Sequence, residues 1–428
     1  MKIAFITSFP PSRHALNEYG FHVADQLRQE KCVDLTVLAD YLPAPGDELP
    51  NFRVVRCWGF GRQSNIATLL SAIRKVKPHV AWFNLGFASF GARPLPAMLG
   101  LVAPIAARLS GVYSHVTLHQ LFETVDLDDA AVTSPRLYRA GGWLATHLLL
   151  SANSLSVLLP TYRRTLDEKY GRGRVSVRLH GIFAGKPDAP DFTRRGNPNH
   201  RILAFGKWGT YKRLELLIEA FDRVATKFPD ARLVIAGGDH PKTPGYVSSM
   251  AQRYANDRVR FLGYVPEESI ANLFREASLA VMPYTSSAGS SGVAHLAAQY
   301  GVPVIASAIR DFREIAEHEG IAIRFFTPGD ADSLVEQLLR ALHCPDELKQ
   351  MAWQSYAAGV AMSMPRVVRE YIRSFRQHER IKTLQLAANL RRAGQTPRRF
   401  QGADELARTV GERIQRWQDE DEIAGSKA

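Results

Sequence analysis

Cysteine is scarce in this chain of 428 residues, which contains only Cys32, Cys57 and Cys344. Three scattered cysteines cannot build a disulfide framework, and they lack the paired spacing that a structural zinc site needs. Disulfide-free chains are typical of reducing compartments, so we expect a cytoplasmic protein.

Long hydrophobic runs are also missing. The most apolar stretch, residues 95–109, contains two prolines and an arginine and is shorter than the roughly 20 residues of a membrane-spanning helix. We expect it to form a buried or groove-lining helix. The alternative is a peripheral contact with an anionic membrane, at the inner face of the cell membrane, because apolar surface beside basic surface suits such an interface. The N-terminal apolar run ends in two prolines and is too short for a signal peptide, so we interpret it as a first buried strand.

The chain has an excess of positive charge, with a formal net charge of +12 at pH 7. This excess favours anionic partners such as nucleotides, phosphorylated lipids or membrane surfaces. Lysine and arginine do not gather into a block interleaved with aromatic residues, so nucleic acid is not an expected partner.

Short apolar runs alternate with amphipathic helical patterns through most of the chain, which predicts doubly wound α/β sheets. Residues 184–200 are rich in proline and polar residues and form a predicted linker between two such domains. We expect an N-terminal Rossmann-like domain over 1–183 and a C-terminal one over 201–360. The active site should lie in the cleft between them, because open α/β sheets bind ligands beyond the carboxyl ends of their strands. The predicted arrangement ends with a helix over 361–378 that returns to the N-terminal domain and a charged helical tail over 379–428.

The most informative segment covers residues 202–221. It has the pattern of a buried strand, a loop and an amphipathic helix. Gly206 and Gly209 would let the loop backbone approach a ligand, and Lys207 and Lys212 supply positive charge near a helix N-terminus, which together suit a diphosphate. The alternative is an ordinary strand-to-helix turn with solvated lysines.

With its segments in this order, the chain resembles the family 4 glycosyltransferases, which have the GT-B architecture of two facing Rossmann-like domains. The resemblance covers roughly residues 1–375. It depends on Phe205-Gly206-Lys207 with Lys212 after it and on four further segments, residues 233–238, 259–265, 280–283 and 301–307.

The resemblance implies the following donor-binding residues. Lys207 and Lys212 would hold the donor diphosphate beside Gly206, and Gly263 and Val265 would contact the base. The loop Gly289, Ser290, Ser291, Gly292 and Val293 opens a predicted helix, whose free N–H groups can bind a phosphate. A serine of this loop could instead act only as an N-cap, and both roles are compatible.

The sequence departs from the family at two positions. Family members usually have two glutamates flanking this loop and its helix, and this chain has Ala288 and Leu296 there. Sugar and ribose would then be held by neighbours, for which the candidates are His295, Tyr284, Glu314, Ser286, Ser287, Ser290 and Ser291.

The first half supplies the remaining candidates. The resemblance places His119, at the end of a predicted strand, against the donor sugar. The first loop and helix start, with Asn17, Glu18 and Gly20, would face the acceptor. His180 closes the first domain near the cleft, and we assign it no chemistry.

The resemblance implies a hexosyl transfer from a nucleotide-diphosphate sugar to a hydroxyl acceptor with retention, as in the synthesis of cell-envelope polysaccharide or glycolipid. The expected partners are the nucleotide sugar and a glycan or lipid-linked acceptor. No cofactor and no metal are expected, because the two lysines and the helix start would neutralise the leaving diphosphate. The competing hypothesis is a non-catalytic protein that binds nucleotide sugars or glycans. A nicotinamide oxidoreductase is disfavoured, because no Gly-x-Gly-x-x-Gly pattern follows the first strand.

Overall fold

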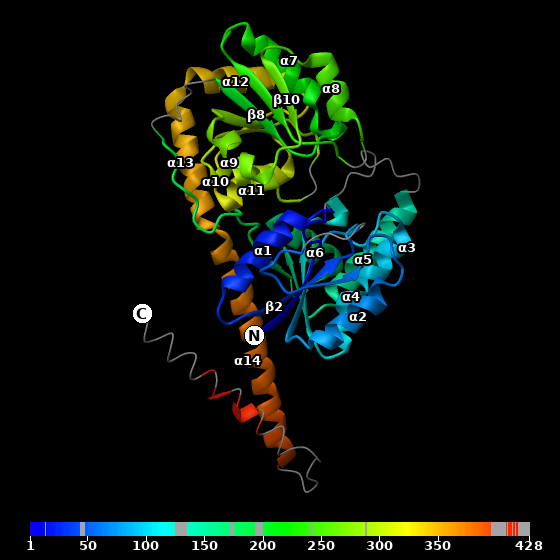
Figure 1. Cartoon of the computed structure of the whole chain (residues 1–428). Helices are drawn as coiled ribbons and strands as arrows, with labels where there is room; N and C mark the ends of the chain where they lie inside the picture. Colours follow the sequence, from blue (N-terminus) through cyan, green and yellow to red (C-terminus); the bar gives the residue numbers. More distant parts are fainter. Residues whose placement is uncertain are drawn as a thin grey trace. The chain divides into compact units, whose positions relative to one another are not determined.

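The computed structural model describes residues 1–12, 14–42, 48–124, 135–171, 175–192, 200–240, 243–286 and 289–394, together with several residues between 408 and 417. The chain divides into a large compact unit, Met1–Val367, and a smaller unit, Val368–Ala428. The large unit contains two parallel sheets with helices packed against them (Figure 1).

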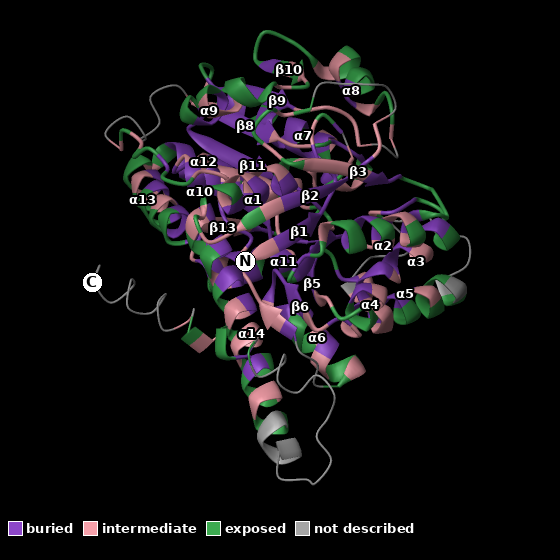
Figure 2. Ribbon diagram, turned by 60° about the horizontal axis from the view of Figure 1, so that its bottom comes forward, coloured by how far each residue is buried: buried purple, intermediate pink, exposed green. Residues whose placement is uncertain are grey.

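The first sheet has seven strands in the order β3-β2-β1-β4-β5-β6-β7, and all neighbours are parallel. Its strand order reverses between β1 and β4, the arrangement that opens a crevice at the carboxyl ends of the strands. The inner strands bury nearly every side chain, as expected of a parallel sheet covered on both faces (Figure 2). The strands are β1 (Lys2–Ile6), β2 (Asp34–Asp40), β3 (Val54–Trp58), β4 (Val80–Leu85), β5 (Tyr113–Leu118), β6 (Ser154–Val157) and β7 (Val175–Val177).

The helices of this half are α1 (Asn17–Gln29), α2 (Asn65–Val76), α3 (Pro94–Leu101), α4 (Ala103–Leu109), α5 (Pro135–Leu150) and α6 (Pro160–Tyr170). One prediction was wrong here. The apolar stretch at 95–109 forms two short helices that meet at Val102, and Pro104 stands in the first turn of the second. These helices are not fully buried, since Leu95 and Leu109 expose 57% and 79% of their surface.

The second sheet has six strands in the order β10-β9-β8-β11-β12-β13. They are β8 (Arg201–Phe205), β9 (Arg232–Ala236), β10 (Val259–Gly263), β11 (Leu279–Met282), β12 (Val304–Ser307) and β13 (Ile323–Phe326). Their helices are α7 (Leu214–Ala225), α8 (Tyr246–Tyr254), α9 (Glu267–Arg275), α10 (Gly292–Gln299), α11 (Arg310–Glu319), α12 (Ala331–His343) and α13 (Pro345–Ala361). The first sheet ends at Val177 and the second begins at Arg201, so the predicted linker falls between them, with residues 193–199 outside the described ranges. The predicted fold of two doubly wound α/β domains is confirmed.

The C-terminal region is helical, as predicted. A single helix, α14 (Met364–Gly394), runs without a break through residue 378, where the sequence predicted a change to the tail. The predicted return of this segment to the N-terminal domain stays a prediction. Within the described ranges, no helix combines the length and the apolar character that crossing a bilayer requires.

Candidate functional site

The large unit contains a cavity of about 220 Å³ with walls from both halves of the fold. The first half contributes the start of α1, the residues after β5 and the segment around residue 180. The second half contributes the loop after β8 and the loop that opens α10. The lining residues are Leu16, Asn17, Glu18, Tyr19, His119, Gln120, His180, Phe183, Lys207, Gly289, Ser290 and Gly292.

The loop after β8 folds tightly beside this cavity. Gly206 has a φ of +147°, and a Cβ at Gly237 would lie 1.9 Å from the carbonyl oxygen of Gly206. Only glycine allows the ends of β8 and β9 to approach in this way, because any side chain would collide with the backbone. A short 3₁₀ turn, Thr210–Lys212, then leads into α7 and turns Lys212 back toward the glycine.

Lys212 is a buried cation, only 8% exposed. Its ammonium nitrogen lies 4.5 Å from the ring centre of Tyr284 and 5.6 Å from that of Trp208. A Cβ placed on Gly206 would lie 2.9 Å from this nitrogen and 3.7 Å from the side chain of Val293. The structure thus brings Gly206, Lys212 and Val293 together, while their binding of a diphosphate stays a prediction.

Nothing negative compensates Lys212 in the described part of the chain, where no carboxylate lies within 4.0 Å of its nitrogen. Burial, assisted by the nearby charge of Lys207, lowers the pKa of Lys212 to about 7. Lys207 itself is exposed and lines the cavity. Burying a charged lysine without an anion costs free energy, and a bound phosphate would reduce that cost.

The loop that opens α10 meets the first half of the fold at His119. Gly289 has a φ of +118°, and a Cβ there would lie 2.7 Å from the carbonyl oxygen of His119. Ser291 is the N-cap, since its hydroxyl accepts from the N–H of Ala294 at 3.4 Å. The buried hydroxyl of Ser290 has no hydrogen-bond partner among the described residues, and it lines the cavity. The N-cap alternative is therefore confirmed for Ser291, while Ser290 remains available to a ligand.

His119 follows β5 and is buried at the cavity wall. Its Nε2 lies 2.6 Å from Oδ1 of Asn84, and because that oxygen can only accept, Nε2 carries the proton. Burial lowers the pKa of His119 to about 3, so the ring is neutral near pH 7 and its Nδ1 can act only as an acceptor. A neutral imidazole of this kind suits a sugar hydroxyl better than a phosphate.

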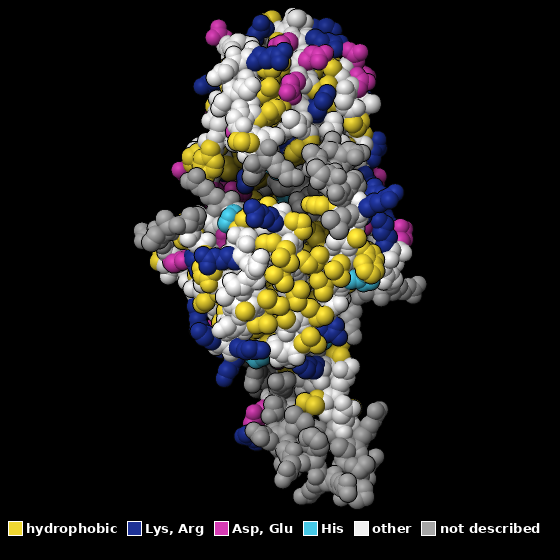
Figure 3. Space-filling model, turned by 90° about the vertical axis from the view of Figure 1, so that its right-hand side faces the viewer, with side chains coloured by type: hydrophobic (Ala, Val, Ile, Leu, Met, Phe, Trp, Pro, Cys, Tyr) yellow, Lys and Arg dark blue, Asp and Glu magenta, His cyan; other side chains and the backbone are white. Residues whose placement is uncertain are grey.

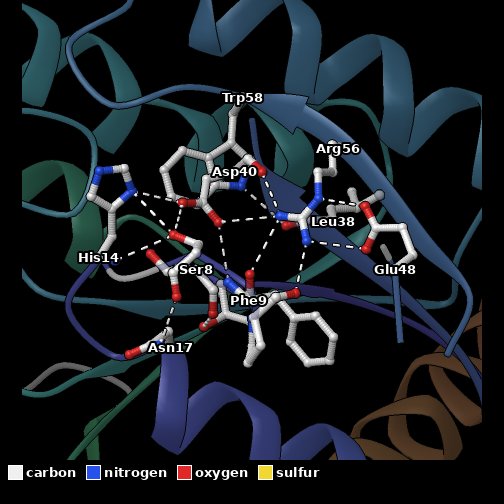
Figure 4. A network of polar contacts seen from close by, with 12 residues as sticks. Ser8, Phe9, His14, Asn17, Leu38, Asp40, Glu48, Arg56 and Trp58 are labelled. Carbon is white, nitrogen blue, oxygen red and sulfur yellow. Dashed lines mark hydrogen bonds and ion pairs between the residues drawn. The ribbon is translucent and has the colours of Figure 1, made fainter. Parts of the chain in front are cut away.

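A polar network fixes the loop before α1 (Figure 4). The buried carboxylate of Asp40, at the end of β2, accepts hydrogen bonds from the Ser12 hydroxyl and, at 2.7 Å, from Nδ1 of His14. Arg56 donates to the backbone carbonyl of Asp40 at 2.7 Å. The amide of Asn17 donates to the Ser12 carbonyl at 2.8 Å. These bonds hold the first turn of α1 in place, so Asn17 and Glu18 form one wall of the cavity.

The structure places several predicted site residues away from this cavity. Gly20 packs on β1, because a Cβ there would lie 2.4 Å from the hydroxyl of Thr7. The carboxylate of Glu314 accepts from the N–H of Thr161 at 2.7 Å and is paired with Arg164 of α6. Gly263 and Val265 lie at and just after the end of β10 and do not line the cavity.

His295 was a candidate for holding ribose or sugar, but its ring is buried and its nitrogens face protein groups. Its Nδ1 donates to the carbonyl of Ser291 at 2.7 Å, and its Nε2 forms an ion pair with Glu319 at 2.8 Å. At the two positions where the family usually has glutamate, Leu296 packs against the hydrophobic core, and Ala288 lies outside the described residues.

Five residues that line the cavity were not predicted as site residues: Leu16, Tyr19, Gln120, His180 and Phe183. Of these, His180 had been placed near the cleft but assigned no chemistry. All but Tyr19 lie in connecting segments without a recognisable motif. Only their positions in the sequence could have indicated a role in the site. Gln120 follows His119, and Leu16 and Tyr19 flank the predicted acceptor residues Asn17 and Glu18. Among the described residues, no cluster of three or more His, Cys, Asp or Glu side chains could hold a metal ion.

Comparison with known proteins agrees with this geometry. Residues 199–344 match the family described as glycosyl transferases group 1. Residues 199–344 are therefore similar to a group 1 glycosyltransferase domain. It includes the glycine turn, both lysines and the loop that opens α10.

One curated relative is mannosylfructose-phosphate synthase of Agrobacterium fabrum, with 30% identity over 158 residues, which cover 32% of this chain and only 34% of the relative. Among solved structures, a sucrose-phosphate synthase from Thermosynechococcus elongatus is 18% identical and superposes with a TM-score of 0.67, covering 89% of this chain and all of that one. HepE of Anabaena, in complex with UDP and glucose, is 16% identical with a TM-score of 0.64, covering 88% of this chain and all of that one. These structures share the two-domain GT-B fold that the sequence predicted.

Proposed function

We propose that this protein is a glycosyltransferase that moves a sugar from a nucleotide-diphosphate sugar to a hydroxyl acceptor with retention. The observation that carries the proposal is Lys212, a buried lysine without an anionic partner among the described residues, held beside a glycine turn in a group 1 glycosyltransferase domain. A nucleoside diphosphate supplies the missing negative charge. HepE, which has this fold, was solved with UDP, and this supports the same ligand class here.

In the proposed reaction, the bond between the anomeric carbon and the diphosphate oxygen breaks as the bond to the acceptor oxygen forms on the same face. The acceptor proton passes to the leaving phosphate, so no protein base is needed. Lys207, Lys212 and the free N–H groups at the start of α10 stabilise the developing negative charge. The hydroxyl of Ser290 adds a donor at the same place.

The remaining groups bind the two substrates. His119, neutral at pH 7, accepts a hydrogen bond from a hydroxyl of the transferred sugar. Asn17 and Glu18, on the opposite wall, contact the acceptor. We propose a glycan or lipid-linked acceptor and a role in cell-envelope polysaccharide or glycolipid synthesis in the cytoplasm. Gly263 and Val265 remain our proposed contacts for the base.

The test is a thermal-shift panel of UDP, GDP, ADP and their common sugar conjugates, followed by a search for product. A ligand that binds only the folded state raises its stability by RT ln(1 + [L]/Kd), about 2.7 kcal/mol at a hundredfold excess over Kd. We expect one base to raise the melting temperature and its sugar conjugate to yield a glycoside. Protection without product from any donor or acceptor would favour the non-catalytic binding protein. Absence of protection by every nucleotide would contradict the transferase and would leave only a protein that binds glycans.

Transfer should not require a divalent ion, because in this proposal the two lysines and the start of α10 neutralise the leaving diphosphate as a metal does in other transferases. We expect the rate to stay within about twofold of its original value after dialysis against a chelator. The assay is product formation with and without EDTA, and then with Mn²⁺ restored. A complete loss that manganese reverses would refute metal independence but would leave the transfer reaction standing.

A further inference from the structure

Helices α3, α4 and α5 lie side by side on one flank of the first sheet. Their outward side chains include an unusual number of large exposed hydrophobic residues. Leu95 exposes 57% of its surface, Leu109 79%, Leu144 46% and Trp143 55%. Figure 3 shows a broad hydrophobic area on this side of the protein. We call it the α3–α5 face.

Every Asp, Glu, Lys or Arg side chain on the described parts of α3, α4 and α5 is basic. Residues 49–122, which include α3 and α4, contain no Asp or Glu, and neither does α5. Arg93, Arg108, Arg136 and Arg139 are exposed on or beside these helices. Figure 3 shows Lys and Arg side chains around the edge of the hydrophobic area. Glu123, the first acid after β5, is engaged by the hydroxyls of Thr146 and Tyr170.

A soluble domain rarely exposes so many large apolar side chains together, and a patch of this kind marks an interaction surface. A protein partner would usually need acidic side chains to match the arginines, whereas a bilayer with anionic lipids offers negative charge and an apolar interior together. Trp143 has the amphipathic ring that is enriched at membrane–water boundaries. Arginine can extend its long side chain to lipid phosphates while its methylene groups stay in the apolar layer.

We propose that the α3–α5 face is a membrane-docking surface that binds the anionic surface of a lipid bilayer. The two short helices α3 and α4, interrupted near Pro104, cannot span the membrane, so they lie in its surface with Leu95 and Leu109 inserted at the acyl boundary. Docking requires both parts of the face, the apolar side chains for insertion and the arginines for charge. The proposal depends only on the residues of this face and not on the sugar-transfer reaction.

The experiment is co-sedimentation of the full chain with vesicles of phosphatidylcholine alone or with about one third phosphatidylglycerol, at low and high salt. We expect binding to the anionic vesicles, little to the neutral ones, and weakening by salt. The double variant Leu109→Glu/Leu144→Glu should bind the anionic vesicles at least tenfold more weakly. Arg93→Ala/Arg139→Ala should weaken binding to anionic vesicles several-fold and leave the weak binding to neutral vesicles unchanged.

Val360→Glu is the matched control, because Val360 is 47% exposed, like Leu144, but lies on α13 of the second half. It should bind vesicles as the wild type does. Thermal melts establish that each variant is folded, since all replaced side chains are exposed. Failure of the wild type to bind anionic vesicles, or equal loss in the control, would overturn the proposal. A wild-type dimer in light scattering that Leu109→Glu/Leu144→Glu converts to monomer, without vesicle binding, would assign the face to self-association instead.

Discussion

Replacing Lys212 by methionine is expected to have two opposite effects. The variant should transfer sugar at least about 10²-fold more slowly, because removing one donor from a preorganised anion site typically lowers kcat by that factor or more. It should also melt at a higher temperature than the wild type in the absence of ligand. Methionine fills similar space between Trp208 and Tyr284 and needs no counter-charge.

The gain in stability of Lys212→Met follows from the lowered pKa of Lys212 in the wild type. Burial lowers the pKa of Lys212 from 10.5 to about 7. Since each pKa unit corresponds to about 1.4 kcal/mol, the buried ammonium destabilises the fold by on the order of 5 kcal/mol while both states are protonated. The penalty is complete below pH 7 and decreases between pH 7 and 10.5, because the folded state has then released the proton. The stability gap between Lys212→Met and wild type should therefore be largest below pH 7 and should close toward pH 10.5.

The pH dependence of donor affinity tests the protonation of Lys212 independently of stability. A diphosphate pairs with the protonated lysine, so binding above pH 7 must take up a proton, and affinity should fall as the pH rises. Lys207→Met is the control, since Lys207 is exposed and its loss should slow transfer but raise the melting temperature much less than Lys212→Met does, by removing only the smaller, Coulombic cause of the lowered pKa of Lys212. Denaturant melts, calorimetric titration with the nucleotide and initial rates measure these effects. A Lys212→Met protein that is less stable than wild type at pH 6 would show that the lysine is a structural element.

All strands except β7 could be predicted, because strands of a parallel sheet that is covered on both faces are short continuous apolar runs in the sequence. Segments such as β4 and β11 bury every residue, and only a run without polar alternation can do that. Helices were harder to predict. Helix α11 carries two charged residues in its first turn and was missed, although one face of it is buried. The split between α3 and α4 was missed as well, because Pro104 was interpreted only as a mark against a membrane span.

The glycine turn with its nearby lysines was predictable because it follows from local chemistry, and its role in binding phosphate stays a proposal. The cavity was not predictable, because its walls come from segments far apart in sequence that meet only when the two sheets fold together. The backbone contact between Gly289 and His119 joins residues 170 positions apart, and no local pattern indicates it. Glu314 illustrates the opposite error. It was named as a neighbour that could hold sugar or ribose, but its carboxylate is engaged by Thr161 and Arg164.

Breaking the buried pair of His295 and Glu319 should cause a large loss of stability. Both side chains are nearly inaccessible, at 2% and 0% exposed, and their charged atoms are 2.8 Å apart. Replacing Glu319 by glutamine keeps the size of the side chain but removes the counter-ion that favours the protonated ring of His295. Removing one partner of a buried pair typically lowers the free energy of unfolding by about 3–5 kcal/mol.

The loss should depend on pH in a defined direction. Burial opposes protonation of His295, but the charge of Glu319, its contact with the ring and the bond to Ser291 outweigh it and raise the pKa. A group whose pKa is raised in the folded state stabilises it fully below the unfolded value near 6.5, and this contribution is lost as the pH rises through the folded value. Without Glu319, burial should instead hold the pKa of His295 below 6.5. The difference in unfolding free energy between wild type and Glu319→Gln should therefore be largest near pH 6 and should shrink by pH 9.

Urea unfolding at these two pH values measures the difference, and the exposed pair of His200 and Asp230 provides the matched control. Asp230 is 63% exposed, so Asp230→Asn should change the unfolding free energy by less than about 1 kcal/mol at either pH. An equally small effect of Glu319→Gln would mean that water reaches the pair and that His295 is neutral. A large effect would establish a fixed positive charge within α10, four residues after its N-cap Ser291. Because the carboxylate of Glu319 neutralises that charge at 2.8 Å, the pair acts on folding and adds little to the field of the helix start beside the proposed phosphate site.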